Sequence, residues 1–248
     1  MKKILVIATF FISFSKLFAC QCVPENFEKK YLSADFVAVI TIKETFGNNI
    51  YNHDGNQMNI YKAKINIEKI YKGIPIWELN VFGTTTYASS GACEKLVKPN
   101  EKYLVLLNKN SNGEYYISSC SEMSKIDNNR TINSQLKTEQ KIFKYLEKNK
   151  GSLYGIFVDY FDNSENWDQT SKKVITDFFK TFGKKINGKF GIYKVKIDDN
   201  QKIVEIIPIK KTGLNEQKIQ ELMRKNLEIE NYLGSNYGNE FLICLKFR

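Results

Sequence analysis

Strict alternation of apolar and polar residues marks the stretch from position 61 to 68. The apolar members are Tyr61, Ala63, Ile65 and Ile67, and the polar members are Lys62, Lys64, Asn66 and Glu68. Because successive side chains of a strand point to opposite faces, this pattern predicts a strand with one buried and one solvated face. Runs rich in β-branched and aromatic residues predict four more strands, at residues 36–42, 79–82, 103–107 and 115–118.

Turn-forming residue pairs lie between the five predicted strands. These pairs are Asp54-Gly55, Lys72-Gly73, Pro99-Asn100 and Asn112-Gly113. Five short strands joined by such turns are typical of a small closed barrel such as the OB-fold. The pattern therefore predicts a β-barrel domain over residues 20–126.

Residues 127–134 are polar and have no periodicity, which is typical of a linker. After them, apolar residues recur at the spacing of a helix instead of alternating. Ser134 is placed to cap a helix that ends near residue 150. The apolar residues on one face of this helix are Leu136, Ile142, Phe143 and Leu146. A second helix is predicted from about residue 168 to 182, with Val174, Ile175, Phe178, Phe179 and Phe182 as its core stripe.

Strand-like segments and a third helix fill the rest of the chain. They are a strand at 153–161, a hairpin of 188–197 and 203–209, a helix at 215–225 and a strand at 241–247. The predicted fold class is α+β, with a five-stranded OB-like barrel first. A linker and helix over 127–150 and a small β-α-β-β-α-β interaction domain over 151–248 follow it.

The first 19 residues have the features of an export signal. Lys2 and Lys3 precede an apolar run, residues 4–14, that is too short to span a bilayer. Ala19 is a suitable small residue at the cleavage point. Residues 17–20 also resemble a loose lipobox, in which Cys20 would be lipidated and its amine acylated. Export, either secreted or to the cell envelope, is predicted, and both a free and an acylated Cys20 stay open.

Basic residues exceed acidic residues by ten over the whole chain. Removal of Lys2, Lys3 and Lys16 with the leader would leave a net charge near +7. Such a protein can bind anionic polymers, membranes or acidic partners. The lysines are spread along the sequence, however, so we interpret the charge as a compositional bias rather than a built patch.

Five cysteines are present, and four of them invite two disulfides in an exported protein. Cys20 and Cys22 are too close for an easy mutual bridge, which favours pairing with Cys93 and Cys120. A metal site is the competing interpretation, but Cys-x-Cys lacks the usual two-residue spacing. Cys244 lies in an apolar segment and is predicted to be a buried free thiol.

The first half of the chain resembles the inhibitory domain of the tissue inhibitors of metalloproteinases. The resemblance rests on the segments 20–24 (CQCVP), 33–37 (SADFV) and 61–73, which ends KIYKG, together with Cys93, 103–105 (YLV) and Ser119-Cys120. It implies a netrin-like OB barrel with bridges Cys20–Cys93 and Cys22–Cys120. Leu32 stands where that family has a cysteine of its third bridge.

The resemblance also implies a mechanism of inhibition. The α-amine and carbonyl of Cys20 would chelate the zinc of a target protease and displace its water nucleophile. Gln21, longer than the small hydroxyl residue usual there, would enter the specificity pocket. The residues implied to contact the target are Cys20, Gln21, Cys22, Val23, Pro24, Gly91 and Ala92. The alternative is an envelope-anchored module, lipidated or not, that binds another protein without inhibiting it.

The segment 188–248 is similar to the C-terminal domain of TonB-type proteins. The similarity rests on GIYKVKI at 191–197, an acidic turn, Val204-Glu205 and a final alternating strand. It implies a small protein-binding module in a bacterial envelope.

No catalytic constellation is visible. The single histidine, His53, lies in a polar Asn-rich stretch predicted to be a solvated turn, so a histidine-dependent triad or two-histidine metal site is excluded. No cofactor is predicted, and the chain is not expected to be an enzyme. Nucleic-acid binding is not expected either, because it needs aromatic platforms in a basic groove and the export signal removes most nucleic-acid contexts.

Overall fold

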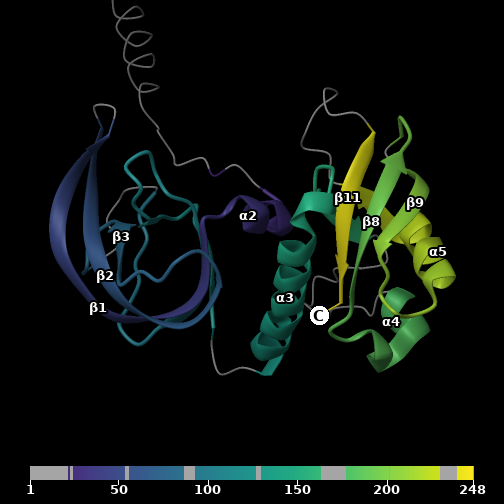
Figure 1. Cartoon of the computed structure of the whole chain (residues 1–248), viewed down its shortest axis with the longest axis horizontal. Helices are drawn as coiled ribbons and strands as arrows, with labels where there is room; N and C mark the ends of the chain where they lie inside the picture. The colour runs from purple at the N-terminus through teal and green to yellow at the C-terminus, as the bar shows by residue number, and fades with distance from the viewer. Residues whose placement is uncertain are drawn as a thin grey trace, which may run out of the picture. The chain divides into compact units, whose positions relative to one another are not determined.

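The chain folds into two compact units (Figure 1). The computed structural model describes residue 22 and residues 25–53, 56–86, 93–126, 130–162, 177–200, 202–229 and 239–247. The first unit contains Met1–Pro24 and Ala38–Ser124, and the second contains Glu25–Val37 and Lys125–Arg248. The sequence predicts one continuous first domain over 20–126, whereas the structure assigns Glu25–Val37 to the second unit.

A curled six-stranded sheet forms the first unit (Figure 1). Its strands are β1 (Phe36–His53), β2 (Asn56–Lys72), β3 (Glu78–Phe82), β4 (Lys102–Leu107), β5 (Tyr116–Ile117) and β6 (Glu122–Lys125). Their order is β5-β3-β2-β1-β4-β6. β3 pairs antiparallel with β2 and parallel with the short β5.

The alternating pattern of β2 is confirmed by the burial of its side chains. Tyr61, Ala63 and Ile65 are buried, whereas Lys62 and Lys64 are exposed. One face of the sheet is buried at β2, which explains why every second residue of this strand is apolar.

Three details of the first unit differ from the prediction. The sheet has six strands rather than five, because β6 was not predicted; its sequence, EMSK, has no apolar alternation. The first two strands extend far beyond their predicted segments, over 18 and 17 residues. His53 is the last residue of β1 rather than part of a turn.

Left-handed backbone conformations confirm predicted turns at Gly73, Asn100 and Gly113, with φ values of 90°, 67° and 79°. Gly73 follows the last residue of β2 and lets the chain turn sharply there, since residues with a Cβ rarely adopt this φ. The predicted turn at Asp54-Gly55 lies outside the described residues.

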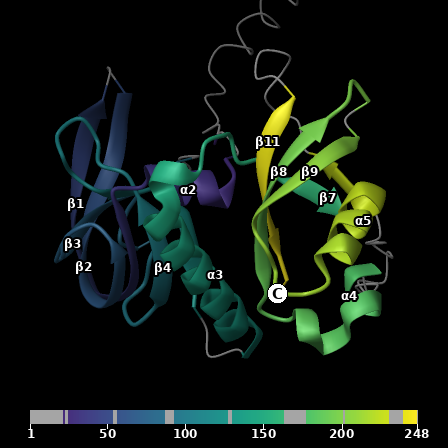
Figure 2. The ribbon, with the colours of Figure 1, turned by 45° about the vertical axis from the view of Figure 1, so that its right-hand side comes forward.

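The second unit is built on a three-stranded antiparallel sheet (Figure 2). Its strands are β8 (Phe190–Ile197), β9 (Ile203–Lys210) and β11 (Glu240–Lys246), in the order β11-β8-β9. The predicted hairpin and final strand are confirmed. The predicted third helix is α5 (Glu216–Asn226), capped by Asn215, whose side-chain oxygen accepts from the Lys218 N–H at 3.1 Å.

Helices lie on both faces of this sheet (Figure 2). α4 (Asp177–Phe182) and α5 pack on the face that carries Tyr193, Val195 and Ile243. On the other face are α2 (Phe27–Ser33) and α3 (Arg130–Asn149), where Tyr31 stacks on Phe143 with ring centroids 4.4 Å apart. Because both faces are covered there, the central residues of β11 are continuously apolar and buried, as are the first four residues of β8. The second half of β8 alternates, with Lys194 and Lys196 between Val195 and Ile197.

Several helical and strand boundaries in this unit correct the prediction. α3 begins at Arg130, so Ser134 lies inside the helix and is not its N-cap. The predicted strand at 153–161 is reduced to β7 (Tyr160–Asp162) and an isolated bridge from Phe157 to Leu242. β7 pairs with β10 (Leu227–Ile229), which was not predicted. The N-terminal part of the helix predicted at 168–182 lies outside the described residues.

Cys244 is a buried free thiol on β11, as predicted. Burial is the main cause that raises its pKa well above the ordinary value, and the nearby Glu28 carboxylate raises it further. None of the helices among the described residues is both long and apolar enough to cross a bilayer.

Candidate functional site

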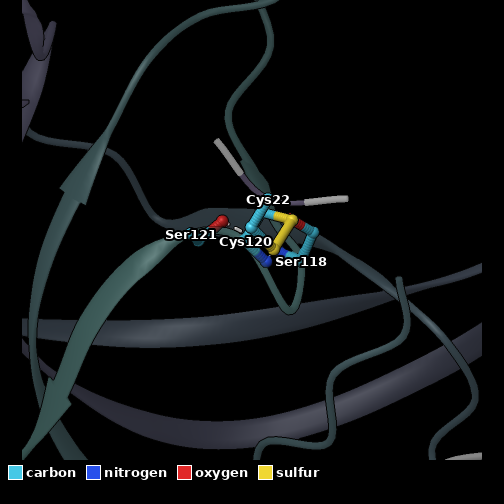
Figure 3. The surroundings of a disulfide bond; sticks show 4 residues. All are labelled: Cys22, Ser118, Cys120 and Ser121. Atoms are coloured by element: carbon cyan, nitrogen blue, oxygen red, sulfur yellow. Dashed lines mark hydrogen bonds between the residues drawn. A yellow bond between two sulfur atoms is a disulfide. The ribbon is translucent and has the colours of Figure 1, made fainter. Parts of the chain in front are cut away.

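A disulfide between Cys22 and Cys120 ties the N-terminal end of the described chain to the first unit (Figure 3). The two Cα atoms are 5.2 Å apart, and Cys22 is exposed. This is one of the two bridges that the family resemblance implies, and the structure confirms it.

Serine hydroxyls fix the turn that carries Cys120 (Figure 3). Ser118 Oγ accepts from the Cys120 N–H at 3.2 Å, and Ser121 Oγ accepts from the Ser118 N–H at 2.9 Å. The Ser121 N–H in turn donates to the Ser118 carbonyl at 3.1 Å. The N–H groups of Ser118, Cys120 and Ser121 are thus all bonded within the turn. These hydrogen bonds fix the backbone that carries Cys120.

Cys93 lies next to this turn. Its carbonyl accepts from the Ser119 N–H at 3.0 Å, which places Cys93 and Cys120 on neighbouring backbone segments. Cys93 is itself disulfide-bonded. The predicted Cys20–Cys93 bridge also involves Cys20, which lies outside the described residues.

The segment that follows Cys93 is held on the sheet by Tyr61. The Tyr61 hydroxyl donates to the Lys95 carbonyl at 3.0 Å and accepts from the Val97 N–H at 2.9 Å. The Lys95 N–H also donates to the Phe82 carbonyl at 2.7 Å. We call residues 93–97 the clamped strip. Burial is the main cause that raises the pKa of Tyr61, so its phenol stays neutral and keeps both hydrogen bonds at neutral pH.

Three aromatic rings gather beside the clamped strip. Phe82 stacks on Tyr116 at a centroid distance of 5.2 Å, and Tyr51 lies 6.4 Å from Phe82 and 5.9 Å from Tyr116. Burial, followed by the hydrogen bond to Glu114, raises the pKa of Tyr116. This aromatic cluster connects the long β1 with β3 and β5, the two strands next to the disulfide.

Most of the target-contacting residues implied by the resemblance lie outside the described part of the chain. They are Cys20, Gln21, Val23, Pro24, Gly91 and Ala92. Cys22 is described, and it is bonded to Cys120 as expected. The structure therefore gives the base of the predicted site, not its contact surface.

Sequence reasoning missed the residues that support this base. Tyr61 was assigned only to the buried face of its strand, although a buried tyrosine normally finds a partner for its hydroxyl. The serines at 118 and 121 flank Cys120, and short hydroxyl side chains at such positions are a recognisable turn signal. The aromatic cluster joins residues up to 65 positions apart, and no local pattern indicates such a contact.

No group of three or more histidine, cysteine, aspartate or glutamate side chains that could hold a metal is found among the described residues. The Cys22–Cys120 disulfide and the hydrogen bond from the Ser119 N–H to the Cys93 carbonyl bring the three described disulfide-bonded cysteines onto adjoining segments of the first unit.

Comparison with known proteins agrees with this arrangement. The model of the family described as tissue inhibitor of metalloproteinase matches residues 18–145, more than half of the chain. A search of curated proteins found no match. The matched family is one of inhibitors rather than enzymes. The match therefore indicates that this region is a metalloproteinase-inhibitor-like module. The chain, with Cys22 bonded to Cys120 at the start of the matched region, belongs to the tissue inhibitor of metalloproteinase family.

Proposed function

We propose that this protein is exported and inhibits a zinc metalloprotease through the amino end that begins at Cys20. The observation that carries the proposal is the Cys22–Cys120 disulfide within the region that matches the inhibitor family. A disulfide is typical of an exported protein, and members of this family are extracellular.

The proposal includes the second bridge, Cys20–Cys93. Cys93 is disulfide-bonded, Cys22 is bonded to Cys120, and Cys244 is a free thiol. Cys20 is the cysteine that remains as its partner. Two bridges two residues apart would hold the first residue on the base formed by Ser119, Cys93 and the clamped strip. A closed netrin-like OB barrel, as the resemblance implies, would supply the support beneath that base.

The chemistry follows from the nature of an amino-terminal residue. An α-amine has a pKa of about 8, so part of it is neutral at pH 7 and carries a free lone pair. The amine nitrogen and the Cys20 carbonyl oxygen would bind the target zinc together. They would displace the bound water, which is the nucleophile that the protease needs. Gln21 would enter the specificity pocket, while Val23 and Pro24, with Gly91 and Ala92, would line the cleft.

Extension of the amino end by one residue tests chelation directly. Adding an alanine before Cys20 moves the α-amine away from the zinc and leaves the disulfides in place. Inhibition constants against a panel of zinc proteases should rise by about 100-fold or more, which corresponds to about 2.8 kcal/mol. The matched control carries the alanine after Arg248 and should inhibit like the parent protein.

Intact mass of the exported protein tests the state of its amino end. A chain that begins at Cys20 and is four hydrogens lighter than the reduced form supports the proposal. Acyl chains on Cys20 would contradict it, because an amide nitrogen is not a zinc ligand of this kind. Equal inhibition by the extended and parent proteins would also overturn chelation.

A further inference from the structure

The loop between β2 and β3 exposes large apolar side chains. Ile74 is 66% exposed and Trp77 is 73% exposed, and Pro75 between them is also exposed. The loop is anchored, because the Ile65 N–H donates to the Trp77 carbonyl at 3.0 Å. Its apolar side chains are therefore presented to solvent from a fixed backbone.

Two lysines precede this loop along β2. Lys69 and Lys72 lie at the end of β2, with the Lys69 ammonium 4.9 Å from the centroid of the Tyr71 ring. Residues 62–78 contain four lysines and two glutamates, a net charge of +2. Lys62 forms an ion pair with Glu78 at 3.1 Å, and Lys102 from β4 forms one with Glu68 at 2.8 Å. Glu44 from β1 forms a third ion pair, with Lys64, at 3.0 Å. Together the segment and these outside partners, Lys102 and Glu44, contain five lysines and three glutamates, so the net charge stays at +2.

We propose that the loop at residues 73–77 binds the surface of an anionic phospholipid bilayer. Ile74 and Trp77 enter the interface between headgroups and acyl chains, where the amphipathic indole ring is favoured. Lys69 and Lys72 lie at the level of the phosphates and are attracted to a negative surface. A protein partner is less well matched, because lysine is depleted in protein–protein interfaces.

The loop and the clamped strip lie at opposite ends of β3. The loop precedes β3, whereas the last residue of β3, Phe82, is bonded to the clamped strip after Cys93. The five residues of β3 separate these two regions by about 13 Å at the usual rise of a strand. Membrane binding through the loop is thus independent of the proposed inhibition.

Fluorescence of Trp77 reports on this binding. The chain has two tryptophans, Trp77 and Trp167, so the Trp167→Phe variant leaves Trp77 as the reporter. Protein whose intact mass shows no acyl chain is titrated with vesicles of phosphatidylcholine, with and without 30% phosphatidylglycerol. We expect a blue shift of Trp77 emission with the anionic vesicles that weakens as salt is added.

Vesicle co-sedimentation of side-chain variants in the Trp167→Phe background and the parent background completes the test. Ile74→Ser with Trp77→Ser should lower the apparent affinity for anionic vesicles at least tenfold. The matched control is Ile50→Ser, which changes an apolar side chain of similar exposure, 64%, on β1 and should bind like the parent. No binding to anionic vesicles, or binding with unchanged Trp77 emission and no loss in the double variant, would overturn the proposal.

Discussion

Tyr61 illustrates how one side chain links the core of the first unit to the candidate site. Its ring is fully buried in β2, while its hydroxyl bonds the backbone of both Lys95 and Val97. The ring therefore contributes to the apolar core, and the hydroxyl fixes the clamped strip. A substitution that keeps the ring separates these two contributions.

Tyr61→Phe should lower the free energy of unfolding by about 1–3 kcal/mol, because the buried Val97 N–H loses its acceptor. It should also weaken inhibition more than its effect on folding explains, since the clamped strip supports Cys93. Urea unfolding and inhibition constants measure the two effects.

The pH dependence of this variant supplies its control. Since burial raises the pKa of Tyr61, the folded state holds the phenolic proton more tightly than the unfolded state. That contribution to stability is complete below the ordinary tyrosine pKa of about 10 and is lost as pH rises through the folded value. The stability difference between the parent and Tyr61→Phe should therefore shrink above pH 10. A constant difference would contradict this account.

At the residue level, the sequence predicted burial better than hydrogen bonding. The alternation at 61–68 identified Tyr61 as buried, and the apolar context of Cys244 identified a buried thiol. The partners of the Tyr61 hydroxyl lie 34 and 36 residues away and are backbone groups. Backbone groups carry no identity in the sequence, so those contacts could not be predicted.

The helix α2 is held by a contact between residues that are far apart in the sequence. The ammonium of Lys246, on β11, lies 2.8 Å from Glu28 Oε1, and the Glu28 side chain is fully buried. Asn26 caps this helix by accepting from the Glu28 N–H at 2.9 Å, and its amide donates to Asp159 at 2.8 Å. The helix is therefore attached to the rest of the second unit by an ion pair and a hydrogen bond.

Lys246→Met should destabilise the protein by about 3–5 kcal/mol, because it leaves the Glu28 carboxylate buried without its cation. The double variant Glu28→Gln with Lys246→Met should recover much of this loss. Urea unfolding measures the differences.

Lys194→Met provides the matched control, since Lys194 forms an exposed ion pair with Glu240 on the same sheet. Its cost should stay below about 1 kcal/mol. Equal costs for the two lysine variants would show that the buried pair does not stabilise α2.

Helices and strands could be predicted where a regular apolar pattern extends over many residues. β2, the β8–β9 hairpin, α5 and β11 were all predicted, since each buries a regular set of apolar side chains. β6, β7 and β10 have four residues or fewer and no pattern of their own. α2 was missed, although Asn26 and the pair Phe27 and Tyr31, four residues apart, are helical signals.

For the molecule as a whole, the Cys22–Cys120 bridge closes a loop of 98 residues. Replacing both cysteines by serine should lower the free energy of unfolding by about 4–5 kcal/mol in the chain-entropy account. It should also abolish inhibition, because the amino end loses one of its attachments. Thermal unfolding and inhibition assays measure both effects.

Cys244→Ala is the control for this pair, since Cys244 takes part in no bridge. That variant should keep the disulfide mass signature and the inhibition constant of the parent. An unchanged unfolding midpoint in the double serine variant would contradict the stabilising role of the bridge.

The path of the chain between its two units restricts how the protein can be dissected. The chain passes from the first unit into the second after Pro24, returns after Val37 and leaves again after Ser124. A fragment that stops before α3 would retain α2 while losing the strand and helix that cover Tyr31 and Glu28. A fragment that starts at α3 would lack α2 altogether. A clean excision would therefore need the segment Glu25–Val37 to be transplanted, and truncation at residue 126 should give an insoluble product.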